Sequence, residues 1–146
     1  MNVMIDTNII LDDILNRTIR AKDARRINQL VIDNRINGYV TANSITDIHY
    51  IVSKNCGGKI AREVIRNLLV TFNIVTVEGK DCLNALDLPL SDFEDALVVT
   101  CANKAALSYI ITNDTIFLQE VHLSVPSISP TDFLLEFEKL SQHRLK

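Results

Sequence analysis

Short apolar runs that favour β-strands alternate with segments of helical periodicity along the whole chain, and this alternation constrains the fold most strongly. Strands are expected at residues 3–5, 39–41, 74–77, 109–112 and 125–128. Helices are expected at residues 9–15, 20–36, 43–56, 59–72, 80–87, 91–106, 115–120 and 129–142. The alternation predicts a three-layer α/β protein, in which helices cover both faces of a mostly parallel sheet of four or five strands.

Length and composition limit the class of protein. The chain has 146 residues, of which 47% are hydrophobic, so we expect residues 1–146 to form a single domain with a sizeable core. No apolar run approaches the roughly 18 residues of a membrane span, and the N-terminal residues read as a strand that Asp6 interrupts, not as a signal peptide. Cys56, Cys82 and Cys101 have no closely spaced partner. They predict free, mostly buried thiols in a cytoplasmic protein without membrane association.

The net charge of −3 gives no overall signal for nucleic-acid binding, but the charges are unevenly distributed. Residues 14–66 hold ten basic and four acidic side chains, so the rest of the chain is strongly acidic. A basic segment beside an acidic one would hold a polyanion next to a cation site, although solvated helix faces explain the same pattern. The residues considered for RNA binding are Arg17, Arg25, Arg26, Lys54, Lys59 and Arg62.

Four acidic residues lie at expected strand ends or helix starts. Asp6 follows the first strand directly, and Asp114 follows the strand at 109–112. Asp47 and Asp95 each lie in the first turn of an expected helix. Because the carboxyl ends of parallel strands share one edge of a sheet, these side chains are expected to meet there. Their mutual repulsion would favour a hard divalent cation between them.

Each of these positions also has a purely structural explanation. Asp6 or Asn8 could cap the helix that follows, and Asp47 places favourable charge near a helix N-terminus. Asn113 and Asp114 together are typical of a turn. The set of four positions, and not any one of them, therefore indicates a site.

Residues 91–95 allow two interpretations. Ser91 and Glu94 match a capping box, which predicts a structural role for Glu94. Asp92 and Asp95 are three residues apart and share a helix face, where two like charges cost stability unless a cation lies beside them. We therefore assign Asp95 to the site first and Asp92 second.

The histidines do not indicate a zinc site. His49 is two residues from Asp47 and points to a different side of its helix, while His122 and His143 are isolated. A site built from carboxylate oxygens favours Mg²⁺ or Mn²⁺ instead.

The acidic and polar residues discussed above lie in four segments. These are MIDTNIIL at 4–11, SITDIHYI at 44–51, DFEDALVVTCA at 92–102 and IITNDTIF at 110–117. Their order, over most of the chain, resembles the PIN domain family, and in particular small prokaryotic proteins of the VapC toxin type. The first and third segments are fairly specific, and the second and fourth are loose. The resemblance implies a PIN-like three-layer fold.

The resemblance also implies roles for individual residues. Asp6 and Asp95 resemble the first and third metal-binding acids, with Asp92 as a frequent companion. Asp47 stands where the family commonly has the longer Glu, so its contact with the metal is expected to run through water. Asp114 stands where many members have Asn or Asp. The polar residues that resemble those holding the acids in place are Thr7, Asn8 and Thr112.

By this resemblance, the protein is a divalent-metal-dependent ribonuclease that cleaves single-stranded RNA, with Asp6, Asp47, Asp95 and Asp114 as catalytic residues and Asp6, Asp92, Asp95 and Asp114 as metal ligands. Bound Mg²⁺ or Mn²⁺ would activate water and stabilise charge on the phosphate oxygens. Among toxins, the family also implies a cognate antitoxin and a homodimer. Asp47 and a degenerate TRNxxDF element depart from the commonest toxin pattern.

Three other classes were considered. A phosphatase of the haloacid dehalogenase type needs D-x-D after its first strand, and the second position of that motif is Asn8. In a response-regulator receiver, a phosphoacceptor Asp follows a middle strand, but none directly follows Val77, and Asp12 and Asp13 lie inside an expected helix. A non-catalytic PIN-like module that binds RNA or protein remains open, and a metal titration separates it from a nuclease.

Overall fold

The computed structural model describes residues 1–17, 19–120 and 123–146, and a five-stranded parallel sheet forms its centre. The strands are β1 (Asn2–Ile5), β2 (Asn37–Thr41), β3 (Asn73–Val75), β4 (Tyr109–Ile111) and β5 (Ser127–Ile128). Their order across the sheet is β3-β2-β1-β4-β5. The chain therefore builds outward from β1 in one direction and then in the other, which places a topological switch point between β1 and β4.

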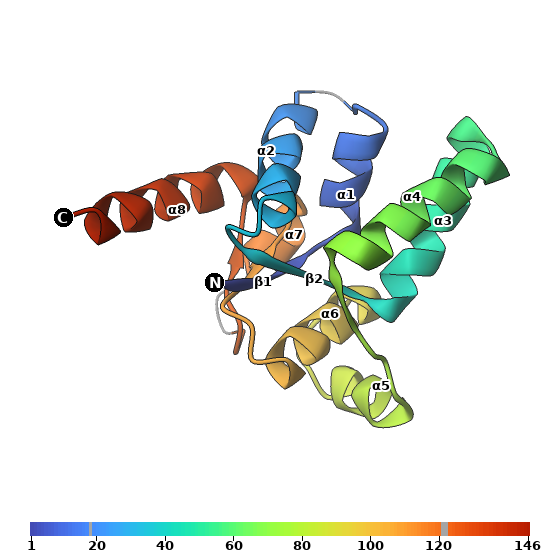
Figure 1. Ribbon diagram of the computed structural model, residues 1–146. Coiled ribbons are helices and arrows are strands. Elements are labelled where there is room, and N and C mark those ends of the chain that lie inside the picture. The colour runs from blue at the N-terminus through green and yellow to red at the C-terminus, as the bar shows by residue number, and fades with distance from the viewer. Residues whose placement is uncertain (18, 121–122) are drawn as a thin grey trace.

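Helices cover both faces of this sheet (Figure 1). They are α1 (Thr7–Ile14), α2 (Ala21–Ile32), α3 (Ala42–Cys56), α4 (Gly58–Thr71), α5 (Gly79–Leu86), α6 (Phe93–Lys104), α7 (Thr115–Leu118) and α8 (Pro130–Arg144). Side chains of β1 alternate between two cores: Val3 and Ile5 pack with α1 to α4 and α8, whereas Met4 packs with α5, α6 and α7. The predicted three-layer α/β fold with a parallel sheet is confirmed.

The second helix is shorter than its apolar pattern predicts, because α2 ends at Ile32 and not at residue 36. Asn34 adopts a left-handed backbone conformation with φ of 55°, which Asn tolerates better than most residues, and this turns the chain out of the helix. Gly38 lies inside β2. A Cβ at Gly38 would lie 2.8 Å from the ring of Phe72, so the close approach of these two segments requires glycine.

Other element boundaries differ by a few residues. The helix expected at 43–56 begins at Ala42, with Thr41 at the N-cap position. The third strand ends at residue 75, before the β-branched run is complete, because its pairing with β2 ends there. The last strand has only two residues, 127–128, since only these two pair with β4.

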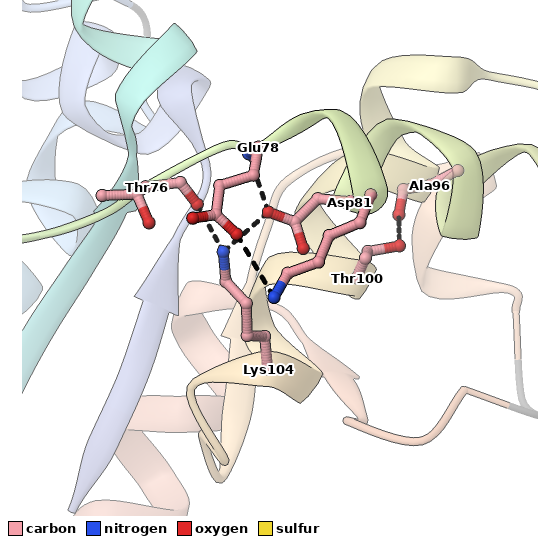
Figure 2. A network of polar contacts seen from close by, with 7 residues as sticks. Thr76, Glu78, Asp81, Ala96, Thr100 and Lys104 are labelled. Atoms are coloured by element: carbon pink, nitrogen blue, oxygen red, sulfur yellow. Dashed lines mark hydrogen bonds and ion pairs between the residues drawn. The ribbon is translucent and has the colours of Figure 1, made fainter.

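Polar contacts fasten the C-terminal end of α6 to the connection between β3 and α5 (Figure 2). The Lys104 Nζ atom donates to the Asp81 Oδ2 atom and to the Thr76 carbonyl oxygen, each at 2.7 Å. The Glu78 backbone amide donates to the same Asp81 oxygen at 2.8 Å. The hydrogen bond from Lys104, followed by that from the Glu78 amide, lowers the pKa of the buried Asp81 carboxyl. These contacts hold the helix whose other end carries Asp95.

Within the described ranges, no helix has both the length and the apolar character needed to cross a membrane. The three cysteines are free, as expected. The prediction that they are mostly buried is wrong, because Cys56 is exposed, Cys82 is half-buried and only Cys101 is buried.

Candidate active site

Six carboxylates line one cavity of about 370 Å³ at the carboxyl edge of the sheet. The lining residues are Asp6, Thr7, Asn8, Asp47, Tyr50, Ile51, Asp92, Glu94, Asp95 and Asp114. Asp6 follows β1 and Asp114 follows the loop after β4, so the cavity lies at the switch point between these two strands. All five acids assigned from the sequence are therefore brought together, and Glu94 joins them.

The Asp6 carboxylate points into this site and does not cap a helix. Asp6 occupies the N-cap position of α1, but its side chain makes no capping hydrogen bond. Instead, its Oδ2 atom accepts a hydrogen bond of 2.8 Å from the Thr112 hydroxyl. The alternative interpretation, in which the Asp6 side chain caps α1, is therefore wrong.

Thr112 also positions Asp114. Its hydroxyl accepts a 3.1 Å hydrogen bond from the Asp114 backbone amide while it donates to Asp6. The Asp114 Oδ1 atom caps α7 by accepting from the amides of Ile116 and Phe117 at 2.9 and 3.2 Å. Asp114 therefore fulfils the structural role of a helix cap and lines the acidic cavity as well.

The N-terminus of α6 corrects a prediction. Asp92, and not Ser91, is the N-cap residue, and its Oδ1 atom accepts from the Asp95 backbone amide at 3.0 Å. The helix begins one residue later than the capping-box pattern indicated, so the Glu94 side chain does not bond the Ser91 backbone as predicted and lines the cavity instead. Two consecutive N-cap candidates in the sequence were the signal that the capping box was ambiguous.

Buried hydroxyls fix α3, which carries Asp47, against α1. The Thr7 hydroxyl donates to the Ser44 hydroxyl at 2.9 Å, and the Thr41 and Ser44 hydroxyls are 2.8 Å apart. Ser44 is one helical turn before Asp47, so this contact sets the position of Asp47 over the cavity. The sequence indicated Thr7 but not Thr41 or Ser44, whose roles depend on how two distant helices pack.

Burial and neighbouring carboxylates raise the pKa values of Asp6, Glu94 and Asp95. Burial, together with Asp92, Asp114 and Asp6, raises the pKa of Asp95 to about 7. Burial also raises the pKa of Asp6, although the hydrogen bond from Thr112 opposes the change. The pKa of Glu94 is raised first by burial and then by the charge of Asp47. Clustered acids with raised pKa values in a cavity are typical of functional sites.

The donor atoms suit a hard divalent cation, because they are all carboxylate, hydroxyl and amide oxygens. In the part of the chain that the structure describes, no three His, Cys, Asp or Glu side chains already form a metal-ligand group. Like charges repel, so side-chain rotations would accompany binding of a cation at Asp6, Asp92, Asp95 and Asp114.

The histidines lie elsewhere or outside the described residues. His49 lines a separate cavity with Arg62 and Arg66, and His143 is exposed near the end of α8. His122 lies outside the described residues.

The six basic residues considered for RNA binding lie in different surroundings. Arg25 pairs with Asp13, and Arg26 pairs with Glu138. The Lys54 ammonium lies 5.4 Å from the ring centre of Tyr50, which lines the acidic cavity. Lys59 is exposed at the start of α4, and Arg62 lies one turn further along that helix, on the cavity that contains His49. Arg17 lines a cavity next to the acidic one, which is described further below.

The sequence matches the PIN domain family model over residues 2–116. The chain belongs to the PIN domain family. That range includes all six carboxylates of the cavity and ends before β5 and α8. A comparison with curated proteins found no match.

Solved structures of VapC toxins and VapBC complexes have the same fold. VapBC2 from Rickettsia felis, bound to a DNA fragment from its promoter, matches with a TM-score of 0.66 and 16% identity, over 88% of this chain and 98% of that one. VapBC-1 from nontypeable Haemophilus influenzae matches with a TM-score of 0.64 and 18% identity, over 90% and 99%. The sarcin–ricin loop cleaving toxin VapC20 from Mycobacterium tuberculosis matches with a TM-score of 0.63 and 15% identity, over 79% and 92%. The chain is therefore a PIN domain protein that resembles VapC in structure.

Proposed function

We propose that this protein is a divalent-metal-dependent endoribonuclease that cleaves single-stranded RNA, as the toxin of a type II toxin–antitoxin pair. One observation carries the proposal: six carboxylates from four chain segments line a single cavity at the switch point of the sheet. So much negative charge would repel a phosphodiester unless a cation neutralised it. The similarity to VapC toxins supports RNA as the substrate.

The proposed metal ligands are Asp6, Asp92, Asp95 and Asp114, with Asp47 completing the catalytic set. A Mg²⁺ or Mn²⁺ ion held there would supply an activated water and neutralise charge on the phosphate oxygens. Thr112 holds the carboxylate of Asp6 and the backbone of Asp114 in place. The hydroxyls of Thr7 and Ser44 do the same for the helix that carries Asp47. Asn8, exposed at the rim, can donate its amide to a substrate oxygen.

Glu94 adds a role that the sequence did not indicate. Both side chains line the acidic cavity, and burial together with the charge of Asp47 raises the pKa of Glu94, so the two can share one proton. We propose that this pair accepts a proton from the attacking water or returns one to the leaving oxygen.

Substitution of the two innermost acids tests the nuclease assignment. Asp6→Asn and Asp95→Asn should each reduce Mg²⁺- or Mn²⁺-dependent cleavage of a labelled single-stranded RNA by at least about a hundredfold, because each removes a negatively charged ligand. Asp87→Asn, a matched change at an exposed position outside the cavity, should cleave normally. Circular dichroism would check folding, and full cleavage by both site variants would reject the assignment.

Calorimetric titration with Mn²⁺ separates the nuclease from a non-catalytic PIN-like module. We expect one binding event or more for the native protein and loss of binding for Asp95→Asn. A native protein that binds no Mn²⁺ at millimolar concentration would favour the module.

We also propose an antitoxin partner, a homodimer and a cytoplasmic location. The VapBC structures, which contain toxin and antitoxin, support the first of these. The free cysteines support a reducing compartment. Co-expression with the product of an adjacent reading frame, followed by size-exclusion chromatography with light scattering, would test partner and stoichiometry together.

A further inference from the structure

A second cavity, of about 680 Å³, adjoins the acidic one and differs from it in charge. It is lined by Asn8, Asp12, Arg17, Ile19, Arg20, Asn113, Asp114 and Thr115. We call this cavity the arginine groove. Asn8 and Asp114 line both cavities, so the arginine groove and the acidic site are neighbours that share these two residues.

A buried carboxylate organises the arginine groove. Asp12, at 5% exposure, accepts a 3.1 Å hydrogen bond from the Arg17 Nε atom on Oδ1 and a 3.0 Å hydrogen bond from the Asn113 Nδ2 atom on Oδ2. The Arg17 backbone amide also donates to the Asp12 carbonyl oxygen at 3.0 Å. Asp12 therefore links the end of α1 to the loop that carries Asp114, and it fixes the position of one guanidinium group between them.

The Arg17 guanidinium is held and still accessible. Its bond to Asp12 uses Nε, and 38% of the side chain is exposed, so the two terminal nitrogens can donate to a ligand in the groove. Both Asp12 oxygens accept hydrogen bonds, which makes this carboxylate an orienting group and not a competitor for a cation. Arginine held in this way presents a planar pair of donors that matches a phosphate.

An RNA strand that crosses the acidic cavity carries a charge at every nucleotide. The scissile phosphate would lie at the acids with their cation, but the next phosphate needs a donor of its own, because the carboxylates repel it. The arginine groove shares Asn8 and Asp114 with the acidic cavity and presents the cationic side chain of Arg17 beside it.

We propose that the arginine groove binds the phosphate next to the scissile one in a single-stranded RNA, with Arg17 as the contact and Asp12 as its positioning residue. The proposal rests on the ribonuclease function proposed above. Of the six basic residues that the sequence indicated, the proposal assigns an RNA contact to Arg17. It also predicts that the RNA runs from the acidic cavity toward the loop between α1 and α2.

Salt-dependent binding tests this assignment. The probe is a short fluorescein-labelled single-stranded RNA, and binding is followed by fluorescence anisotropy in the full-length native protein, across a range of KCl concentrations. Ca²⁺, a hard cation that carboxylates hold, replaces Mg²⁺ to slow cleavage. Adding Arg17→Gln should weaken binding and reduce the slope of log affinity against log salt by about 0.7, the value for one lost phosphate contact on a single strand. Arg144→Gln, a matched change at the exposed end of α8, should leave the slope unchanged.

A readout with the active protein separates this proposal from the function on which it rests. Arg17→Gln alone should raise KM for RNA cleavage more than it lowers kcat, since it removes binding outside the reacting centre. If the native protein cleaves RNA but Arg17→Gln changes neither the salt slope nor KM, the role proposed for the arginine groove is wrong and the nuclease assignment stands. A native protein that neither binds nor cleaves RNA would overturn both.

Discussion

The Thr112 hydroxyl shows how much of this site depends on single side chains. It is fully buried, donates to Asp6 and accepts from the amide of Asp114, so one group sets the spacing of two proposed metal ligands. Asp95 has a different environment, in which burial and four neighbouring acids oppose its ionisation. Thr112 holds Asp6 and Asp114 in place, while the like charges around Asp95 favour binding of a cation.

At the residue scale, Asp95 predicts a pH dependence of stability in the absence of metal. Its pKa is raised to about 7 in the folded state, from about 3.9 in an unfolded chain. The folded state therefore retains the proton longer, and the stabilisation present at low pH is lost as the pH rises through the folded pKa. The unfolding temperature of Asp95→Asn, measured in EDTA, should fall less between about pH 5 and pH 8 than that of the native protein.

Bound metal should offset the loss of stability of the native protein at high pH. At the higher pH, Mn²⁺ should raise the unfolding temperature of the native protein and have little effect on Asp95→Asn, because a ligand that binds only the folded state stabilises it. Asp87→Asn should follow the native protein in both series. Equal pH profiles for native and Asp95→Asn proteins would show that Asp95 is not the perturbed group.

Among the elements, α6 has polar residues with different roles at its two ends. Its first turn places Asp95 and Glu94 in the acidic cavity. Its last turn is fixed by Lys104, which bonds Asp81 and the Thr76 carbonyl oxygen (Figure 2). The helix between them packs against the sheet through buried residues such as Leu97 and Val98.

Loss of the Lys104 contact should destabilise the protein in a pH-dependent way. Lys104→Met leaves the buried Asp81 carboxylate without its cation, so the unfolding temperature should fall at neutral pH. The pKa of Asp81 is lowered in the folded state, so its stabilisation is present above the unfolded pKa and is lost as the pH falls through the folded pKa. The difference from the native protein should therefore narrow in acid.

Lys139→Met, at an exposed position on α8, is the matched control and should change little. The measurement is thermal unfolding by circular dichroism over a pH series. A Lys104→Met deficit that stays constant down to the lowest pH would contradict the assigned role of the ion pair.

At the scale of the molecule, the segment beyond the family match completes the core. The PIN match ends at residue 116, but Phe133 and Leu134 of α8 join the same buried cluster as Val3 and Ile5 of the central strand. The Phe133 ring packs edge-on against Tyr109 of β4, with ring centres 6.1 Å apart. Figure 1 shows α8 leading to the C-terminus.

Removal of this aromatic anchor should affect global stability. Phe133→Ala creates a cavity at a fully buried position, which costs about 3–5 kcal/mol of the free energy of unfolding. Leu135→Ala on the same helix, at a side chain that is 52% exposed, should cost much less. Equilibrium urea unfolding measures both, and similar small losses would mean that α8 is not part of the cooperative core.

The alternation of strands and helices, the parallel sheet, and the placement of Asp6 and Asp114 just after strands could all be predicted from the sequence, because they depend on local periodicity and chain order. The tertiary structure alone decided that β4 lies beside β1, that Glu94 lines the acidic cavity and does not complete a capping box, and that Asp12 holds Arg17 next to that cavity. These features depend on contacts between residues far apart in the chain, or on a one-residue choice of helix start between two nearly equivalent caps. Local sequence patterns do not specify long-range contacts or choose between two nearly equivalent helix starts. The packing of the folded chain does both.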